Sequence, residues 1–291
     1  MSVEAPAPRY AAPTLRDRIG RIWAPVYIDG KGPFRLVLDT GATHSAVTAS
    51  VAKALGLVPD ASHPIELHGV TGSAIVPSIR IESLEVGDLL IRSALLPIVP
   101  DALGGADGVL GTAGLAGMRI FIDFRNDRIT IARSRGRRAP LGFVTIPLEI
   151  KHHHLLTTNA RVGSVRVTAI IDTGSEVSVA NLALREALLR HRSSTQFSKD
   201  EIIGATDTMA IGEGTAVPPI FIGAIAILGA HITTGSLHIF DVWHLTAQPA
   251  ILIGMDALGR VDVLVIDYRR RELQILTRQS GFGPTFTQES R

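Results

Sequence analysis

The tripeptide Asp-Thr-Gly occurs twice in this chain of 291 residues, each time after an apolar run. The first copy is Asp39-Thr40-Gly41, after residues 34–38, and the second begins at Asp172, after residues 167–171. Apolar runs of this kind predict strands, glycine permits a tight turn, and a threonine hydroxyl can hydrogen-bond within that turn. The pattern therefore predicts a carboxylate at the tip of a buried strand, and it does so twice.

The similarity between the two halves extends beyond the tripeptide. The offset between the two aspartates is 133 residues (172 − 39), and Gly30 and Gly163 are separated by the same interval. Three later pairs of segments follow in the same order in both halves, namely 67–72 with 202–207, 108–111 with 252–254, and 122–131 with 266–275. Landmarks that recur in one order predict an internal duplication.

The composition favours a β-rich protein of two lobes. The chain is 46% hydrophobic and 19% charged, and its 28 glycines and 16 prolines punctuate short apolar runs. We expect five segments: a loose N-terminal arm (1–19), a first lobe (20–132), a basic linker (133–142), a second lobe (143–278) and a frayed C-terminal tail (279–291).

A few elements can be placed along the chain. We expect a short helix near residues 48–55, capped by Thr48 and ended by Gly56, and a longer helix from Leu182 to about residue 191, capped by Asn181. Glycine-containing hairpins are expected around residues 69–72 and 204–206, and strands are expected to continue as far as Trp243.

Several classes of function are disfavoured. The formal net charge is only +2, and the arginines of the linker lack interleaved aromatic residues, so we interpret the linker as a solvated connector and expect no nucleic-acid partner. The absence of cysteine excludes disulfides and cysteine catalysis. No apolar run is long enough to span a membrane, and no signal peptide is visible. We therefore expect a cytoplasmic location for the chain as given, or a periplasmic or secreted one if a segment preceded it.

The repeated apolar-apolar-Asp-Thr-Gly motif, a glycine hairpin and a later apolar-apolar-Gly together resemble the retropepsin-like aspartic proteases. The resemblance covers residues 21–277, as a tandem single-chain arrangement related to the bacterial retropepsin-like and pepsin-like enzymes. It implies an all-β acid protease fold of two β-barrel lobes with short helices and an active site between them. It also implies an aspartic endopeptidase that needs no metal or cofactor.

The resemblance assigns roles to particular residues. Asp39 and Asp172 would be the catalytic pair, sharing one proton because two adjacent carboxylates cannot both ionise. The loops around them would be supported by Thr40, Gly41, Ala42, Thr173, Gly174 and Ser175. Substrate would be covered by two flaps, which contain Gly69, Val70, Thr71, Gly72, Gly204, Ala205 and Thr206. We further expect the Ser175 hydroxyl to bond the outer oxygen of Asp172, which would favour its ionised form and leave the proton on Asp39.

Some positions depart from the family pattern. Thr112 and Met255 stand where retroviral enzymes have arginine, and Thr43 and Glu176 stand where those enzymes have aspartate. These departures put the usual ion pair between the lobes in doubt and leave the aspartate pair intact.

Alternative interpretations remain at the level of sequence. A non-catalytic peptide-binding module could use the same fold. Asp101, Asp107 and Asp256 are interpreted as turn residues. The run of three histidines at 152–154 suggests a metal site, but strand alternation would divide it between two faces, so no metal site is expected. Peptide or protein substrates are the expected partners, with one site in a monomeric chain.

Overall fold

The computed structural model describes residues 20–100, 104–151, 155–191, 198–204, 206, 209–277 and 286–288. Strands account for 53% of the protein and helices are few, which confirms the prediction of an all-β fold of the acid protease type. The predicted N-terminal arm, Asp101 and the histidines at 152–154 lie outside the described residues.

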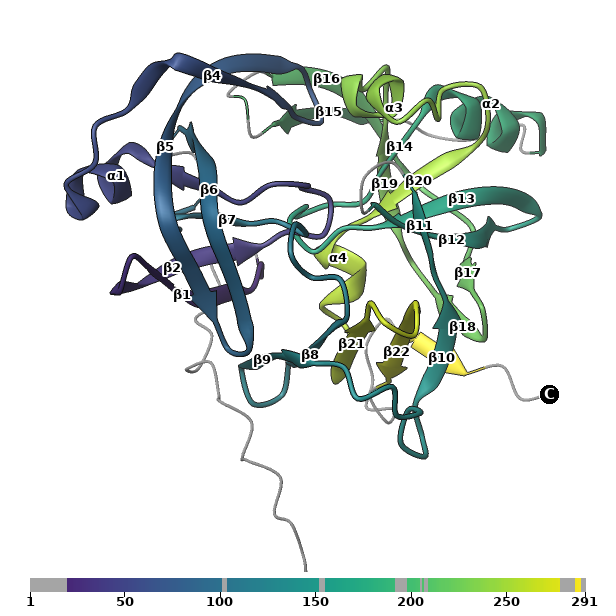
Figure 1. Ribbon diagram of the computed structural model, residues 1–291. Coiled ribbons are helices and arrows are strands. Elements are labelled where there is room, and N and C mark those ends of the chain that lie inside the picture. The colour runs from purple at the N-terminus through teal and green to yellow at the C-terminus, as the bar shows by residue number, and fades with distance from the viewer. Residues whose placement is uncertain are drawn as a thin grey trace, which may run out of the picture.

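The first sheet has seven strands in the order β1-β2-β7-β3-β6-β5-β4, and a further pairing of β1 with β5 closes six of them into a barrel. It is drawn in purple and blue in Figure 1. Its elements are β1 (Trp23–Ile28), β2 (Lys31–Leu38), β3 (Ala46–Thr48), α1 (Ala49–Leu55), β4 (Asp60–His68), β5 (Ser73–Val86), β6 (Leu89–Val99) and β7 (Gly108–Leu110). We refer to this sheet and α1 as the first lobe.

The largest sheet has eleven strands and lies on the other side of the molecule (Figure 1). Its strands are β11 (Glu149–Lys151), β12 (Leu155–Val162), β13 (Val165–Ile171), β14 (Val179–Ala180), β15 (Ser198–Ile203), β16 (Met209–Ala216), β17 (Ile220–Ile222), β18 (Ile225–Ile227), β19 (His231–Thr234), β20 (Ala250–Ile253) and β23 (Phe286–Gln288). This sheet, with α2 (Leu182–His191) and α3 (His238–Val242), is called the second lobe below.

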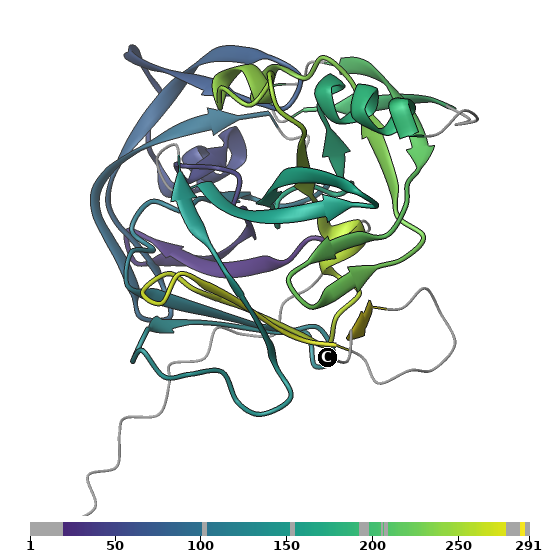
Figure 2. The ribbon, with the colours of Figure 1, turned by 90° about the vertical axis from the view of Figure 1, so that its right-hand side faces the viewer.

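A third sheet joins the two lobes along one side of the molecule (Figures 1 and 2). Its order is β10-β22-β21-β8-β9, so the hairpin β8 (Met118–Asp123) and β9 (Arg128–Arg133) pairs with the later hairpin β21 (Val263–Asp267) and β22 (Glu272–Leu276). The strand β10 (Val144–Pro147) completes it. The central pairing is antiparallel and matches Ile120 with Ile266.

Both lobes use the same set of pairings around their Asp-Thr-Gly loops. In the first lobe β2 runs parallel to β7, β3 antiparallel to β7 and β3 parallel to β6. In the second lobe β13 runs parallel to β20, β14 antiparallel to β20 and β14 parallel to β19. The matched pairings support the predicted duplication.

The helices agree in part with the sequence predictions. Gly56 ends α1 in the left-handed conformation, as predicted, although Thr48 makes no side-chain capping bond there. The Asn181 side chain accepts a hydrogen bond from the Leu184 amide (3.0 Å) and so caps α2 as predicted. The prediction of strand as far as Trp243 is wrong, because residues 238–242 form α3. Leu237, Phe240 and Trp243 recur every three residues and pack in one apolar cluster, which helical geometry permits.

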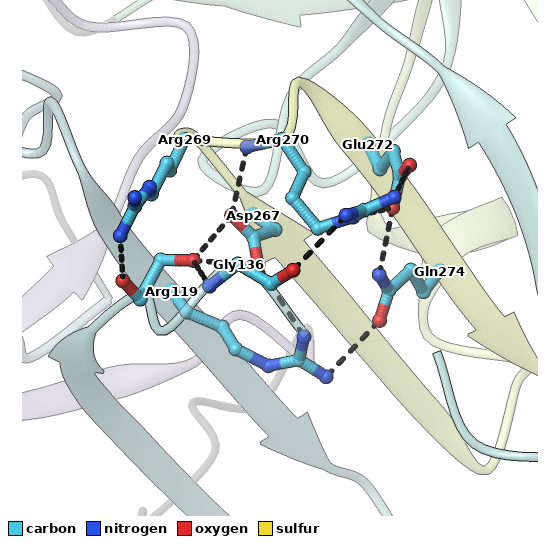
Figure 3. A network of polar contacts seen from close by, with 8 residues as sticks. Arg119, Gly136, Asp267, Arg269, Arg270, Glu272 and Gln274 are labelled. Carbon is cyan, nitrogen blue, oxygen red and sulfur yellow. Dashed lines mark hydrogen bonds and ion pairs between the residues drawn. The ribbon is translucent and has the colours of Figure 1, made fainter. Parts of the chain in front are cut away.

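Two further predictions need correction. The tail was expected to be frayed, but β23 pairs with β18 in an antiparallel manner. The linker was expected to be a solvated connector, and its arginines are indeed exposed, but Ser134 is buried. The Ser134 hydroxyl bonds the buried Asp267 (2.8 Å), and Arg269 and Arg270 donate to the carbonyls of Ser134 and Gly136 (3.2 and 3.0 Å). Figure 3 shows Asp267, Arg269, Arg270 and Gly136 in this network.

One apolar core runs through the three sheets. The largest buried cluster contains Leu36 of β2, Ile171 of β13 and Leu264 of β21, all of them fully buried. The strands that carry the two aspartates are therefore anchored in one packed interior. Within the described part of the chain, no helix is long and apolar enough to cross a membrane.

Candidate active site

Asp39 and Asp172 occupy equivalent positions directly after β2 and β13. The Asp39 amide donates to the Leu110 carbonyl (3.0 Å), and the Asp172 amide donates to the Ile253 carbonyl (3.1 Å). Each aspartate backbone is therefore held by the strand that runs parallel to the strand before it: β7 holds Asp39 and β20 holds Asp172. This pairing fixes the position from which each side chain extends.

Thr40 and Thr173 bind the two loops together through crossed hydrogen bonds. The Thr40 hydroxyl donates to the Ile171 carbonyl (2.7 Å) and accepts from the Thr173 amide (3.0 Å). Reciprocally, the Thr173 hydroxyl donates to the Leu38 carbonyl (2.7 Å) and accepts from the Thr40 amide (3.3 Å). Both side chains are buried, so these bonds are shielded from water and hold the loops in one relative position.

Each motif glycine faces the aspartate of the other lobe. A Cβ atom on Gly41 would lie 2.6 Å from Asp172 Oδ2, and one on Gly174 would lie even closer to the carboxyl group of Asp39. Real Cβ atoms do not approach so closely, so only glycine permits the two carboxyl groups to meet.

The two carboxyl groups hydrogen-bond to each other, which requires that they share a proton. Asp39 is half-buried and Asp172 is buried. Burial raises the pKa of Asp172 well above the ordinary value, and the charge of Asp39 raises this pKa further. Burial also raises the pKa of Asp39, but the bonds from Asp172 and from the Ala42 and Gly41 amides, and the charge of Arg21, oppose this rise. We assign the shared proton to Asp172 and the negative charge to Asp39.

This assignment reverses the expectation drawn from Ser175. The Ser175 hydroxyl donates to the Val177 carbonyl (2.9 Å) and not to Asp172, so the prediction that it favours the ionised form of Asp172 is wrong. Both carboxyl groups accept amide bonds: Asp39 Oδ1 from Gly41 (2.8 Å) and Ala42 (2.9 Å), and Asp172 Oδ1 from Gly174 (2.8 Å). Hydrogen bonds to a carboxylate favour its charged form.

Two serines support the site in a way that the sequence analysis missed. The Ser45 hydroxyl accepts from the Gly111 amide, and the Ser178 hydroxyl accepts from the Gly254 amide, both at 3.1 Å. The signal was present, because each serine lies six residues after its motif aspartate. Thr112 and Met255, at the departures from the family pattern, donate backbone bonds to the carbonyls of Ala42 and Ser175 (2.9 and 2.8 Å).

The prediction that Asp256 is a turn residue is wrong, because it lies in the short helix α4 (Met255–Leu258). Its carboxyl group accepts from the Ser178 hydroxyl (2.8 Å), and burial raises its pKa. Ala113 occupies the matching position in the first lobe, so this support exists on one side of the site. Asp107 does serve as a turn residue, since it exchanges 2.7 Å bonds with the backbone of Arg35.

The two predicted flaps meet at their tips. The first is the β4–β5 hairpin, whose turn is closed by the Gly69 amide bonding to the Gly72 carbonyl (2.7 Å), and the second is the β15–β16 hairpin. The Thr206 hydroxyl donates to the Gly72 carbonyl (3.5 Å), and Gly204 contacts Thr71. Figure 1 shows both hairpins converging at the top of the molecule. Ala205, also predicted to contact substrate, lies outside the described residues.

The described residues contain no group of three or more histidine, aspartate or glutamate side chains that could hold a metal ion. The arrangement around Asp39 and Asp172 brings two carboxyl groups together, with one shared proton. A carboxylate beside a carboxylic acid can accept a proton and donate one in the same step.

Comparison with known protein families points in the same direction. Residues 24–113 match the family model described as aspartyl protease. The matched segment contains Asp39, the first flap and Gly111, and it supports an aspartyl protease family and, with it, a peptidase hydrolase. No curated protein matches the chain.

Proposed function

We propose that the protein is an aspartic endopeptidase that hydrolyses extended peptides by activating a water molecule between Asp39 and Asp172. The observation that carries the proposal is the close approach of these two carboxyl groups, each of which lies against the motif glycine of the other lobe. It is supported by the crossed threonine bonds, which hold both carboxyl groups in place before any substrate binds.

The proposed mechanism follows from the protonation states. The Asp39 carboxylate takes a proton from water while the oxygen of that water attacks the scissile carbonyl carbon. The Asp172 carboxylic acid hydrogen-bonds to the carbonyl oxygen and transfers its proton as the gem-diol forms. The proton on Asp39 then passes to the leaving nitrogen, the C–N bond breaks, and Asp172 recovers a proton from the gem-diol. Neither a covalent intermediate nor a metal ion enters these steps.

In this proposal one chain contains one complete site, with residues 20–132 supplying Asp39 and residues 143–278 supplying Asp172. The two hairpins serve as flaps over the peptide, through Gly69–Gly72 and Gly204–Thr206. Specific activity should then be independent of protein concentration. A dilution series would test this by measuring activity at each concentration and the oligomeric state by light scattering.

The decisive experiment is hydrolysis of a peptide library, followed by mass spectrometry, with and without pepstatin. We expect Asp39→Asn and Asp172→Asn each to lower kcat/KM by at least about 10³-fold, since each removes one of two proton-transfer groups. The double variant is expected to be no worse than either single variant, because the pair acts as a unit.

The matched control is Asp127→Asn, which makes the same substitution at an exposed turn with positive φ, where asparagine is well tolerated. Full activity in either dyad variant would refute the mechanism. Peptides that bind the wild-type protein and are never cleaved would favour the alternative of a non-catalytic peptide-binding module.

A further inference from the structure

The tip of the first flap contacts the second lobe through a pair of histidines. His68 is the last residue of β4 and His238 is the first residue of α3. The His68 Nδ1 and His238 Nε2 atoms lie 3.5 Å apart, and the ring centroids are separated by 5.7 Å with the planes tilted by 39°. Residues 170 positions apart in the sequence therefore meet where the flap ends.

Two other contacts dock the same flap tip on α3. The Ile239 amide donates to the Val70 carbonyl (3.4 Å), and the Val70 side chain packs against the apolar cluster that contains Ile239 and Phe240. This docking is distinct from the contact between the two flap tips, which involves Thr206 and Gly72. We call His68, Val70, His238 and Ile239 together the flap latch.

The histidine contact depends on protonation. Between two neutral imidazoles, a ring N–H of one can face the lone pair of the other, so the 3.5 Å approach is favourable. When both rings are protonated, every ring nitrogen is a donor and two positive charges stand side by side. Histidine is the side chain whose ordinary titration range lies around neutral to mildly acidic pH.

Other charged groups lie on the elements packed at the latch. Most of those on the hairpins have partners: His63 contacts Asp60 (2.7 Å), His231 contacts Asp200 (3.4 Å), and Glu213 pairs with Arg185. Other titratable side chains near the latch in sequence are Glu66 on β4, Asp241 and His244 in or after α3, and Lys199 and Glu201 on β15.

We propose that His68 and His238 act as a proton-operated latch, which holds the first flap against α3 when the rings are neutral and releases it when both are protonated. Acidification then opens access to Asp39 and Asp172 through a conformational step that is separate from the titration of the two aspartates. A flap that opens for substrate and recloses would thus be regulated by the pH of the surroundings.

The test measures flap opening directly, so that it does not depend on peptidase activity. Hydrogen–deuterium exchange of segments 66–75 and 237–243 is followed at about pH 7.5 and about pH 5, on either side of the ordinary histidine pKa, with correction for intrinsic exchange. We expect protection of both segments to fall about fivefold at the lower pH. Two unit charges about 4 Å apart in water repel each other enough to change the ratio of closed to open flap by about this factor. Unchanged protection would overturn the proposal.

Variants separate the latch from a general effect of acid. His68→Phe keeps a ring at the contact and removes the titratable group, so protection in this variant should no longer depend on pH. His63→Gln is the matched control, since His63 lies on the same strand and contacts Asp60 instead of α3, and it should retain the wild-type change. The proposal fails if His68→Phe keeps the pH dependence or if His63→Gln removes it.

Discussion

The Asp39 loop and the Asp172 loop share one backbone framework. In each, the carboxyl Oδ1 atom accepts a bond from the amide of the motif glycine, at 2.8 Å for both Gly41 and Gly174. In each, the threonine hydroxyl reaches across to a carbonyl of the other lobe at 2.7 Å. The geometry of the pair is therefore close to symmetric.

The surroundings of the two loops differ. Asp39 is half-buried, and the positive charge of Arg21 lowers its pKa. Asp172 is buried, and the negative charge of Asp39 raises its pKa. The second lobe also adds Asp256 behind its loop, where the first lobe has Ala113. A symmetric framework thus positions two carboxyl groups, and asymmetric burial and charge decide which one carries the proton.

The largest effect should come from breaking the close approach. Gly41→Ala and Gly174→Ala each insert a Cβ atom against the opposite carboxyl group, so the dyad must separate. We expect kcat/KM to fall by at least about 10²-fold in both, as displacements of about 1 Å do at catalytic groups. The loss should be greater for Gly174→Ala, whose Cβ would lie closer to its neighbour. Steady-state kinetics would measure both.

Gly235→Ala is the control for these substitutions. Its added Cβ would meet its nearest atom at 3.6 Å, which is ordinary contact, and its φ is outside the left-handed range. Activity lost equally in all three variants would show that close approach at the dyad is not the cause.

The crossed bonds should be the next most sensitive feature. Thr40→Val and Thr173→Val keep the side-chain shape and leave a buried amide and a buried carbonyl without their partners. Because unpaired buried polar groups are costly, we expect each variant to lose about 2–4 kcal/mol of unfolding free energy. Urea unfolding would measure the loss, and Thr→Ser at the same positions should restore most of it. A loss under about 0.5 kcal/mol would contradict the assigned role.

The charge asymmetry has its own signature in stability. A pKa raised in the folded state means that the folded protein binds more protons than the unfolded chain, so the unfolding free energy falls as pH rises from the ordinary aspartate pKa through the folded one. Asp172→Asn cannot ionise and avoids this loss. Between about pH 4 and about pH 7, the Tm of Asp172→Asn should therefore rise relative to the Tm of the wild type. A difference that is constant with pH would contradict the buried, protonated Asp172.

The sequence predicted the parts of the site that depend on local pattern. An apolar run ending in Asp-Thr-Gly indicates its own strand and turn, and its repetition indicated that Asp39 and Asp172 would be equivalent. The helix cap at Asn181 and the hairpin at Gly69–Gly72 are local patterns of the same kind, and both appear in the structure.

The parts that failed depend on tertiary packing. Nothing in the residues next to Ser175 reveals that its hydroxyl bonds Val177 and not Asp172. The contact of His68 with His238 joins residues from different lobes. The three-residue spacing of Leu237, Phe240 and Trp243 is a local helical signal that the strand prediction overlooked. The proton assignment likewise depends on burial, which only the assembled lobes define.

The smallest expected effect is a difference in unfolding free energy between variants of the two supporting serines, Ser45 and Ser178. Ser45→Ala and Ser178→Ala each leave a buried glycine amide unpaired, and only Ser178→Ala also removes the donor to Asp256. We expect Ser178→Ala to cost about 1 kcal/mol more of unfolding free energy than Ser45→Ala, the value of one net hydrogen bond. The bond from Ser178 lowers the pKa of Asp256 against the effect of burial, so its loss should weaken the protein more as pH rises and Asp256 ionises. Urea unfolding in the Asp256→Ala background supplies the control, since the two serine variants should then cost the same. An equal cost in the wild-type background would mean that Asp256 adds nothing to the support of the second lobe.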